Sequence, residues 1–325
     1  MISGGIIIHD TDIGAYWEKL FLQSGLDTLG IHPAGGVDAH LTLEKFLSDQ
    51  NDPTVFGFID RLSSKGVRIE LECHALSWLL PREMLAKNAH WFRENEQGER
   101  TADFNMCPSC KEALEYLSER TRLLASIIPW NSEYYHLWID DVASAPCRCE
   151  KCKDRSPSDQ AMIIYNAMLA GLKRYRSNAR LAYLAYHGTI DVPSVNPEEG
   201  IFLEFAPIRR CFEHSINDES CQKNVAEIAS LDSLLAFFGK KDSKVLEYWM
   251  DNSLFSGWKK PFVKLPFNRD ILEKDVEFYR AKGFEHITSF GCFLGEEYAN
   301  EFGVPPVKEY GEVLAHEINN IKAPK

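Results

Sequence analysis

The stretch YYHLWIDD, residues 134–141, joins an apolar and aromatic run to two adjacent carboxylic acids. Short runs of aromatic and branched residues are typical of buried strands. Acids that directly follow such a strand are expected at the edge of the sheet where parallel α/β proteins carry their sites. The segment therefore predicts a core strand that ends at Asp140 and is followed by Asp141.

Similar short apolar, β-branched or aromatic runs recur along the chain, and segments with helical periodicity separate them. The predicted strands are Gly5–His9, Thr28–His32, Val67–Cys73, Tyr134–Asp140, Arg180–Tyr186, Ile201–Phe205, Lys244–Trp249 and His286–Phe290. The predicted helices are Ala15–Gln23, Val55–Ser64, Lys111–Ile127, Asp159–Arg174, Val225–Phe238, Ile271–Ala281 and Val307–Ile318. Eight strand–helix repeats fit a closed barrel better than an open sheet. We therefore predict an α/β protein, a (β/α)8 TIM barrel in which residues 1–325 form one domain.

Glycines and long loops support this arrangement. Gly25, Gly66 and Gly283 each close a predicted helix just before a strand, as glycine at a helix C-terminus should. Two insertions, at about residues 75–108 and 146–157, follow the third and fourth strands. Both leave the carboxyl ends of strands, which form the catalytic face of such barrels. We expect these long loops to be functional or held by a metal.

Composition excludes some classes of partner. The net charge of −12 argues against non-specific binding to nucleic acid or anionic lipid. The sequence contains no apolar run long enough for a membrane span. The first ten residues lack the basic region of a signal peptide and are expected to form a buried strand, so a cytoplasmic location is expected, unless a leader has been lost.

The predicted strand ends carry a dense set of polar and aromatic residues. Substrate-binding roles are expected for His9, His32, His74, Trp78, His187, Arg210, Tyr248, Trp249 and Asp251. Histidine, carboxylate and aromatic side chains around one cavity suit a carbohydrate, because ring faces stack on sugars. We therefore expect a small-molecule or oligosaccharide substrate and no organic cofactor. Arg209 and Arg210 could pair with an anionic sugar or with the acids themselves, and we favour the second role.

Four acids are candidates for catalysis. Hydrolysis of a glycoside needs one carboxylic acid to protonate the leaving oxygen and one carboxylate to act as base or nucleophile. We assign Asp141, or its neighbour Asp140, as the acid and Glu247 or Glu204 as the base or nucleophile. Both glutamates lie within apolar runs, where a carboxylate must be paired or face a polar cavity.

Five of the nine cysteines are clustered in the two long loops. Cys107 and Cys110 form a C-x-x-C unit, and Cys147, Cys149 and Cys152 form C-x-C-x-x-C. Two such units separated by about forty residues predict a structural zinc site, in which any four of the five could be ligands. Disulfides and free thiols are the alternatives. The remaining cysteines, Cys73, Cys211, Cys221 and Cys292, are interpreted as packing residues or lone thiols.

The segment YHLWIDDV, residues 135–142, resembles the H-[IL]-G-G-D-E-V strand of family 20 β-N-acetylhexosaminidases. In that family the Asp orients the substrate acetamido group and the Glu is the general acid. Asp140 matches the Asp, and Asp141 stands where the Glu would be. Trp138 and Ile139 replace the two glycines.

A second resemblance covers roughly residues 70–155. The segments HALSWLLP (74–81), HWFR (90–93), GER (98–100) and MCP (106–108), with the C-x-C-x-x-C unit, are similar to a bacterial barrel family of unknown function. That family is grouped with hexosaminidase-like and α-glucuronidase-like glycoside hydrolases. In the α-glucuronidase-like barrels the acid follows strand four and base candidates follow strands six and seven. The resemblance thus implies Asp141 as acid, with Glu204 and Glu247 as base candidates.

Two other functions compete with a glycoside hydrolase. A non-catalytic barrel that keeps a carbohydrate pocket is favoured by the replaced glycines and the shorter acid. A metal-dependent hydrolase of the amidohydrolase type would use the histidines of the barrel mouth. Such enzymes begin with H-x-H on the first strand. The first predicted strand here ends in Ile8-His9-Asp10, which lacks that motif.

Overall fold

The computed structural model describes residues 3–49, 52–128, 130, 132–142 and 144–315. Eight parallel strands pair in chain order and close into a barrel, which confirms the predicted fold class. The strands are β1 Ser3–His9, β2 Thr28–His32, β3 Arg68–His74, β4 Tyr134–Trp138, β5 Arg180–Ala185, β6 Ile201–Phe205, β7 Lys244–Glu247 and β8 His286–Phe290. Strand β1 pairs with β2 on one side and with β8 on the other, which closes the sheet.

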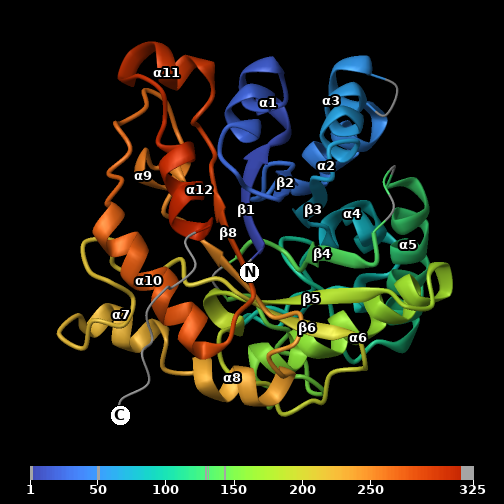
Figure 1. Cartoon of the computed structure of the whole chain (residues 1–325). Helices are drawn as coiled ribbons and strands as arrows, with labels where there is room; N and C mark the ends of the chain where they lie inside the picture. The colour runs from blue at the N-terminus through green and yellow to red at the C-terminus, as the bar shows by residue number, and fades with distance from the viewer. Residues whose placement is uncertain (1–2, 50–51, 129, 131, 143, 316–325) are drawn as a thin grey trace.

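Helices surround the strands, and α5 and α6 pack side by side (Figure 1). The helices are α1 Ala15–Leu22, α2 Ala39–Ser48, α3 Pro53–Ser63, α4 Leu76–Leu79, α5 Lys111–Ile127, α6 Pro157–Tyr175, α7 Gln222–Glu227, α8 Leu231–Phe238, α9 Asn252–Phe255, α10 Arg269–Lys282, α11 Glu296–Phe302 and α12 Val307–Ala315. Short 3-10 helices are η1 Asp10–Asp12, η3 Arg82–Ala86, η4 Ala89–Trp91 and η5 His187–Thr189. Among the described residues, no helix combines the length and apolarity needed to cross a membrane.

Several helix boundaries follow from local chemistry. Gly25, Gly66 and Gly283 have φ values of 74°, 84° and 97°, the left-handed region that glycine occupies without strain. At the start of α10, the side chain of Asn268 accepts a hydrogen bond from the backbone N–H of Ile271. The three glycines are the residues that the sequence predicted to close helices.

Some element predictions differ from the structure. Helices α2, α4, α9 and α11 were not predicted, and the predicted helix Val225–Phe238 is divided into α7 and α8. The predicted end of the last helix, Ile318, lies outside the described residues. Strands β4, β5 and β7 end earlier than predicted. The earlier ends matter for the site, because they place residues 139–142, 186–187 and 248–251 in the loops at the barrel mouth.

The barrel interior holds a charged cluster beneath the mouth. Lys244 Nζ lies 3.1 Å from a carboxylate oxygen of Glu70, 2.8 Å from Glu72 and 3.1 Å from Glu204, and all four side chains are buried. His136 Nδ1 donates to Glu204 at 3.1 Å. Because a buried charge is costly unless it is paired, these groups stabilise one another in place of an apolar core layer.

Candidate functional site

A cavity of about 880 Å³ opens at the carboxyl ends of the strands. It is large enough for a small-molecule ligand. Seven of the predicted residues line it, namely His9, His32, His74, Asp141, His187, Tyr248 and Asp251. The loops that follow β1 to β8 therefore bring residues from distant parts of the sequence to one cavity, as the fold predicts.

Asp141 follows β4 and is held by hydrogen bonds at both carboxylate oxygens. The Tyr186 hydroxyl donates to Oδ1 at 3.1 Å, and the Gly36 backbone N–H donates to Oδ2 at 3.1 Å. His74 Nε2 lies 3.8 Å from Oδ1. Burial acts to raise the pKa of Asp141, but His74, the Tyr186 hydroxyl and the Gly36 N–H outweigh it, so the net pKa is lowered. Asp141 is therefore ionised at neutral pH.

Two consecutive glycines after β2 allow this contact. A Cβ atom on Gly35 would lie 3.0 Å from Oδ2 of Asp141 and 3.1 Å from Cδ2 of His74, closer than ordinary van der Waals contact. Gly36 has a φ of 81°, which directs its N–H to the carboxylate. Neither glycine was predicted as a site residue, although a Gly-Gly pair two residues after the end of a predicted strand was a visible signal.

Asp251 lies in the loop after β7 and is buried at the cavity wall. Its Oδ1 accepts hydrogen bonds from Ser253 N at 3.0 Å, from Leu254 N at 3.3 Å and from the Ser253 hydroxyl, so the residue caps α9. Burial raises its pKa, and the hydrogen bonds from Ser253 and Leu254 offset this only in part. Asp251 therefore retains its proton to higher pH than Asp141.

The pKa of Tyr186 depends on the charges of both Asp141 and Asp251. Burial and then the charge of Asp141 raise its pKa most, and the charge of Asp251 raises it further. The phenol is therefore protonated at neutral pH and acts as a hydrogen-bond donor toward Asp141. Asp141, Tyr186 and Asp251 all line the same cavity.

Three histidines form a regular row on consecutive strands. Each donates from Nδ1 to a backbone carbonyl associated with the next strand: His9 to His32 O at 3.1 Å, His32 to Glu72 O at 2.6 Å, and His74 to Ile139 O at 2.6 Å. Because a carbonyl only accepts, each Nδ1 carries a proton, and Nε2 is the unprotonated nitrogen whenever the ring is neutral. Burial, and then electrostatic repulsion from His9 and His74, lower the pKa of His32 to about 3, so His32 is neutral at pH 7.

Aromatic side chains complete the walls of the cavity. Trp138 and Phe290 pack against His32, with ring centroids 5.8 and 5.0 Å apart respectively. Trp258 lines the cavity and is 64% exposed, so its ring face is available to a ligand. Trp258 was not predicted as a site residue, because nothing in the flanking segment distinguished it from a packing residue.

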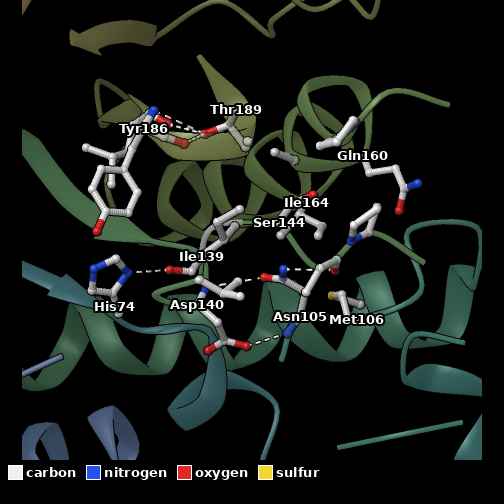
Figure 2. A pocket seen from close by; sticks show the side chains of 17 residues that line it. His74, Asn105, Met106, Ile139, Asp140, Ser144, Gln160, Ile164, Tyr186 and Thr189 are labelled. Carbon is white, nitrogen blue, oxygen red and sulfur yellow. Dashed lines mark hydrogen bonds between the residues drawn. The ribbon is translucent and has the colours of Figure 1, made fainter. Parts of the chain in front are cut away.

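Asp140 does not line this cavity, and Figure 2 shows its carboxylate directed to Asn105. Its Oδ2 accepts hydrogen bonds from the Asn105 backbone N–H and from Arg82 at 2.8 Å. Asn105 Oδ1 in turn accepts from Asp140 N at 3.3 Å, and its Nδ2 donates to Ala145 O at 3.2 Å. The small adjoining pocket is only about 30 Å³. In this position Asp140 ties the loops after β3 and β4 together.

Glu204 and Glu247, the predicted base candidates, also lie away from the cavity wall. Glu204 belongs to the charged cluster of the barrel interior and accepts a hydrogen bond from Trp138 Nε1 at 2.7 Å. Glu247 lies 2.7 Å from Arg210 Nη1 and accepts a hydrogen bond from the Tyr279 hydroxyl at 2.6 Å. Both are completely buried, and their pairing explains why acids occur within apolar strands.

Three predicted substrate-binding residues have structural contacts instead of a place on the cavity wall. Arg210 joins Glu247 and Asp275, which agrees with the favoured pairing of this arginine with acids. Trp249 donates to Asp275 at 2.9 Å. Trp78 donates to Glu44. The neighbouring Arg209 does line the cavity and donates to His187 Nδ1 at 2.9 Å.

The clustered cysteines converge outside the cavity. The thiols of Cys107, Cys147, Cys149 and Cys152 lie within 4.8 Å of one another, and all four are buried. Cys107 Sγ is 3.8 Å from Cys149 Sγ and 3.9 Å from Cys152 Sγ. Four sulfurs bound to zinc at about 2.3 Å in a tetrahedron are about 3.8 Å apart, so these residues fit the metal. Cys110 is half-buried beside this group and is not one of its four members.

Comparison with solved structures relates the fold to glycoside hydrolases. A β-N-acetylhexosaminidase from Bacteroides fragilis matches with a TM-score of 0.57 at 10% identity, over 98% of this chain and 67% of that chain. A GH5 xyloglucanase from Bacteroides ovatus, solved with a XXXG heptasaccharide, matches with a TM-score of 0.50 at 11% identity, over 96% of this chain and 75% of that chain. A GH5 subfamily 4 endo-β-1,4-glucanase from Bacillus licheniformis matches with a TM-score of 0.51 at 11% identity, over 96% of this chain and 58% of that chain. At such identities the likeness shows the barrel fold alone. No protein-family model and no curated protein matches the sequence.

Proposed function

We propose that this protein is a glycoside hydrolase whose catalytic carboxylates are Asp141 and Asp251. The observation that carries the proposal is the contrast between two of the three acids that line the cavity, Asp10, Asp141 and Asp251. The pKa of Asp141 is lowered, whereas burial raises the pKa of Asp251, on the loop after β7. Burial also raises the pKa of Asp10, after β1. Such a divergence separates the proton donor from the ionised partner in enzymes that use two carboxylic acids. The barrel fold shared with glycoside hydrolases is consistent with this chemistry.

The proposed roles follow from the two environments. Asp251, with its raised pKa, donates its proton to the glycosidic oxygen as the bond from that oxygen to the anomeric carbon breaks. Asp141, ionised, either attacks the anomeric carbon or removes a proton from the attacking water. This assignment reverses the role predicted for Asp141 from the sequence. Asp251, which the sequence predicted to bind substrate, takes the place of Glu204 and Glu247 as the second catalytic carboxylate.

A carbohydrate suits the remaining cavity wall. The Nε2 atom of neutral His32 can accept a hydrogen bond from a sugar hydroxyl, because its Nδ1 atom is already used by the Glu72 carbonyl. The exposed ring of Trp258 offers a stacking surface. We therefore propose an oligosaccharide or a small glycoside as the substrate.

The substrate-assisted reaction of family 20 enzymes is a less favourable proposal. That reaction would require Asp140 to contact the substrate, and this carboxylate is bound by Arg82 and Asn105 outside the mouth cavity. The arrangement favours a reaction in which the protein supplies both carboxylates.

A panel of aryl glycosides and oligosaccharides tests the proposal, with turnover and binding measured on each. The wild-type protein should hydrolyse at least one member, and Asp141→Asn and Asp251→Asn should each reduce kcat/KM by about 10²- to 10⁴-fold. Asp232→Asn, at an exposed position on α8 outside the cavity, is a control that should leave hydrolysis unchanged. Binding of a glycan without turnover would instead support the non-catalytic barrel.

We further propose that Cys107, Cys147, Cys149 and Cys152 bind a structural zinc ion. Their four thiolates would complete a closed tetrahedral site, which stabilises a fold and leaves no open position for catalysis. Arg100 Nη1 lies 3.7 Å from Cys147 Sγ, and the backbone N–H of Glu94 lies 3.4 Å from the same sulfur. These donors would stabilise the negative charge of the thiolates. The zinc would hold the loops after β3 and β4 beside each other.

A further inference from the structure

The loop after β6 brings together three residues that are far less conspicuous in the sequence than the clustered cysteines. Ligand atoms of Cys211, His214 and Cys221 lie within 4.8 Å of one another. Their spacing is C-x-x-H, then six intervening residues, then Cys. The sequence analysis had treated both cysteines as packing residues or lone thiols, and the structure instead places them beside one imidazole.

The loop that carries these residues is held in shape by one buried amide. Asn224 Oδ1 accepts a hydrogen bond from Cys211 N at 2.6 Å. Its Nδ2 donates to the carbonyls of Cys211 at 3.1 Å, His214 at 3.3 Å and Ser215 at 2.9 Å. Asn224 is completely buried, and Arg210 donates to the His214 carbonyl at 2.9 Å. The backbone of the loop is therefore fixed independently of any contact between the two thiols and the imidazole.

A carboxylate orients the histidine. Nδ1 of His214 donates to Oδ2 of Asp218 at 2.8 Å, which leaves Nε2 unprotonated in the neutral ring. Metal-binding histidines commonly donate their other ring nitrogen to a carboxylate, which fixes the tautomer and raises the basicity of the ligating nitrogen. Asp218 thus supplies the outer partner that a histidine ligand requires.

We propose that Cys211, His214 and Cys221 form a second metal site, which binds a borderline-soft divalent cation such as Zn²⁺. Two thiolates and one imidazole match the preferences of zinc, and binding would release the two thiol protons. The three residues are half-buried, so solvent can supply the fourth ligand. None of the three lines the mouth cavity. The metal would stiffen the loop that presents Arg209 to that cavity, and the site does not depend on the proposed hydrolase activity.

The test compares the zinc content of full-length variants that are purified with reductant and without chelator. The double variant Cys211→Ser/Cys221→Ser should contain one equivalent less zinc than wild type, with an unchanged circular dichroism spectrum. The difference is informative whether or not the site of Cys107, Cys147, Cys149 and Cys152 is filled. Cys73→Ala, which removes a buried thiol elsewhere, is the matched control and should retain the wild-type content.

Two further measurements distinguish a metal site at Cys211, His214 and Cys221 from free thiols or a disulfide. Asp218→Asn should weaken zinc affinity by about 10- to 100-fold in a competition titration without abolishing it. Co²⁺ bound at the site should give thiolate charge-transfer absorption that the double variant lacks. Equal zinc content in wild type and the double variant would overturn the proposal. So would a Cys211–Cys221 disulfide, seen as a pair of thiols that resist alkylation until reduced.

Discussion

The Tyr186 hydroxyl donates a hydrogen bond to Oδ1 of Asp141 at 3.1 Å, and the charge of Asp251 also raises the pKa of this phenol. The pKa of one side chain is therefore affected by both proposed catalytic acids. Tyr186 comes from the loop after β5, whereas the acids follow β4 and β7.

Tyr186→Phe removes a donor that lowers the pKa of Asp141, so the pKa of Asp141 should rise. Because Asp141 must be ionised to act, the acid limb of the pH profile of kcat/KM should move to higher pH. A lost hydrogen bond to a charged group should also reduce kcat/KM by about 10- to 100-fold. Tyr134→Phe, which removes a hydroxyl bonded to Asp242, is the control. An unshifted acid limb in Tyr186→Phe would argue against Asp141 as the ionised group.

Gly35→Ala should impair the site by crowding. The new Cβ would lie 3.0 Å from Oδ2 of Asp141, so the carboxylate or the loop after β2 must move. A displaced catalytic group should reduce kcat/KM by about 10- to 100-fold with little change in Tm. Gly14→Ala is the matched control, because no atom lies within 4 Å of its added Cβ. Full activity in Gly35→Ala would show that the position of this carboxylate is not critical.

The charged cluster of the barrel interior should be essential for stability. Lys244→Met leaves Glu70, Glu72 and Glu204 without their shared cation, and loss of one partner from a buried ion cluster costs about 3–5 kcal/mol. Urea unfolding monitored by tryptophan fluorescence measures this loss. Lys241→Met, at an exposed site, should change the free energy of unfolding by less than about 0.5 kcal/mol. Similar effects of the two substitutions would contradict the role of the cluster.

Zinc content should distinguish the five clustered cysteines. Cys107→Ser should remove the ion from the four-thiol site and lower Tm, because metal binding contributes to folding. Cys110→Ser should retain it, since the thiol of Cys110 is outside the group of four. Elemental analysis and thermal unfolding of both variants give the answer. Loss of zinc in Cys110→Ser with retention in Cys107→Ser would contradict the assignment.

The fold was predictable from the sequence because strand and helix signals alternate along the chain. Helix-closing glycines such as Gly66 marked the boundaries, and the residues after the strands correctly indicated where the cavity would lie. Helix α2 was missed because it follows the Gly-Gly turn after β2 without a strong start signal. Its absence from the prediction did not alter the order of the strands.

The roles of individual acids were less predictable. An acid within an apolar strand is expected both in a catalytic cavity and in a buried ion pair, and the sequence does not distinguish these cases. Glu204 pairs in register with Lys244 on the neighbouring strand, and Glu70 and Glu72 on β3 reach the same lysine only across the closed barrel. Asp140 and Asp141 are adjacent, and the end of β4 at Trp138 decides which of them faces the cavity.

The most direct test of the roles proposed for Asp141 and Asp251 measures how activity depends on the leaving group of the substrate. Asp251→Asn should hydrolyse glycosides with poor leaving groups about 10²- to 10⁴-fold more slowly, yet retain activity on activated aryl glycosides that need no protonation. Asp141→Asn should lose activity on both kinds of substrate. Equal losses on both substrates for Asp251→Asn, or selective loss for Asp141→Asn, would contradict the proposed assignment of acid and ionised partner.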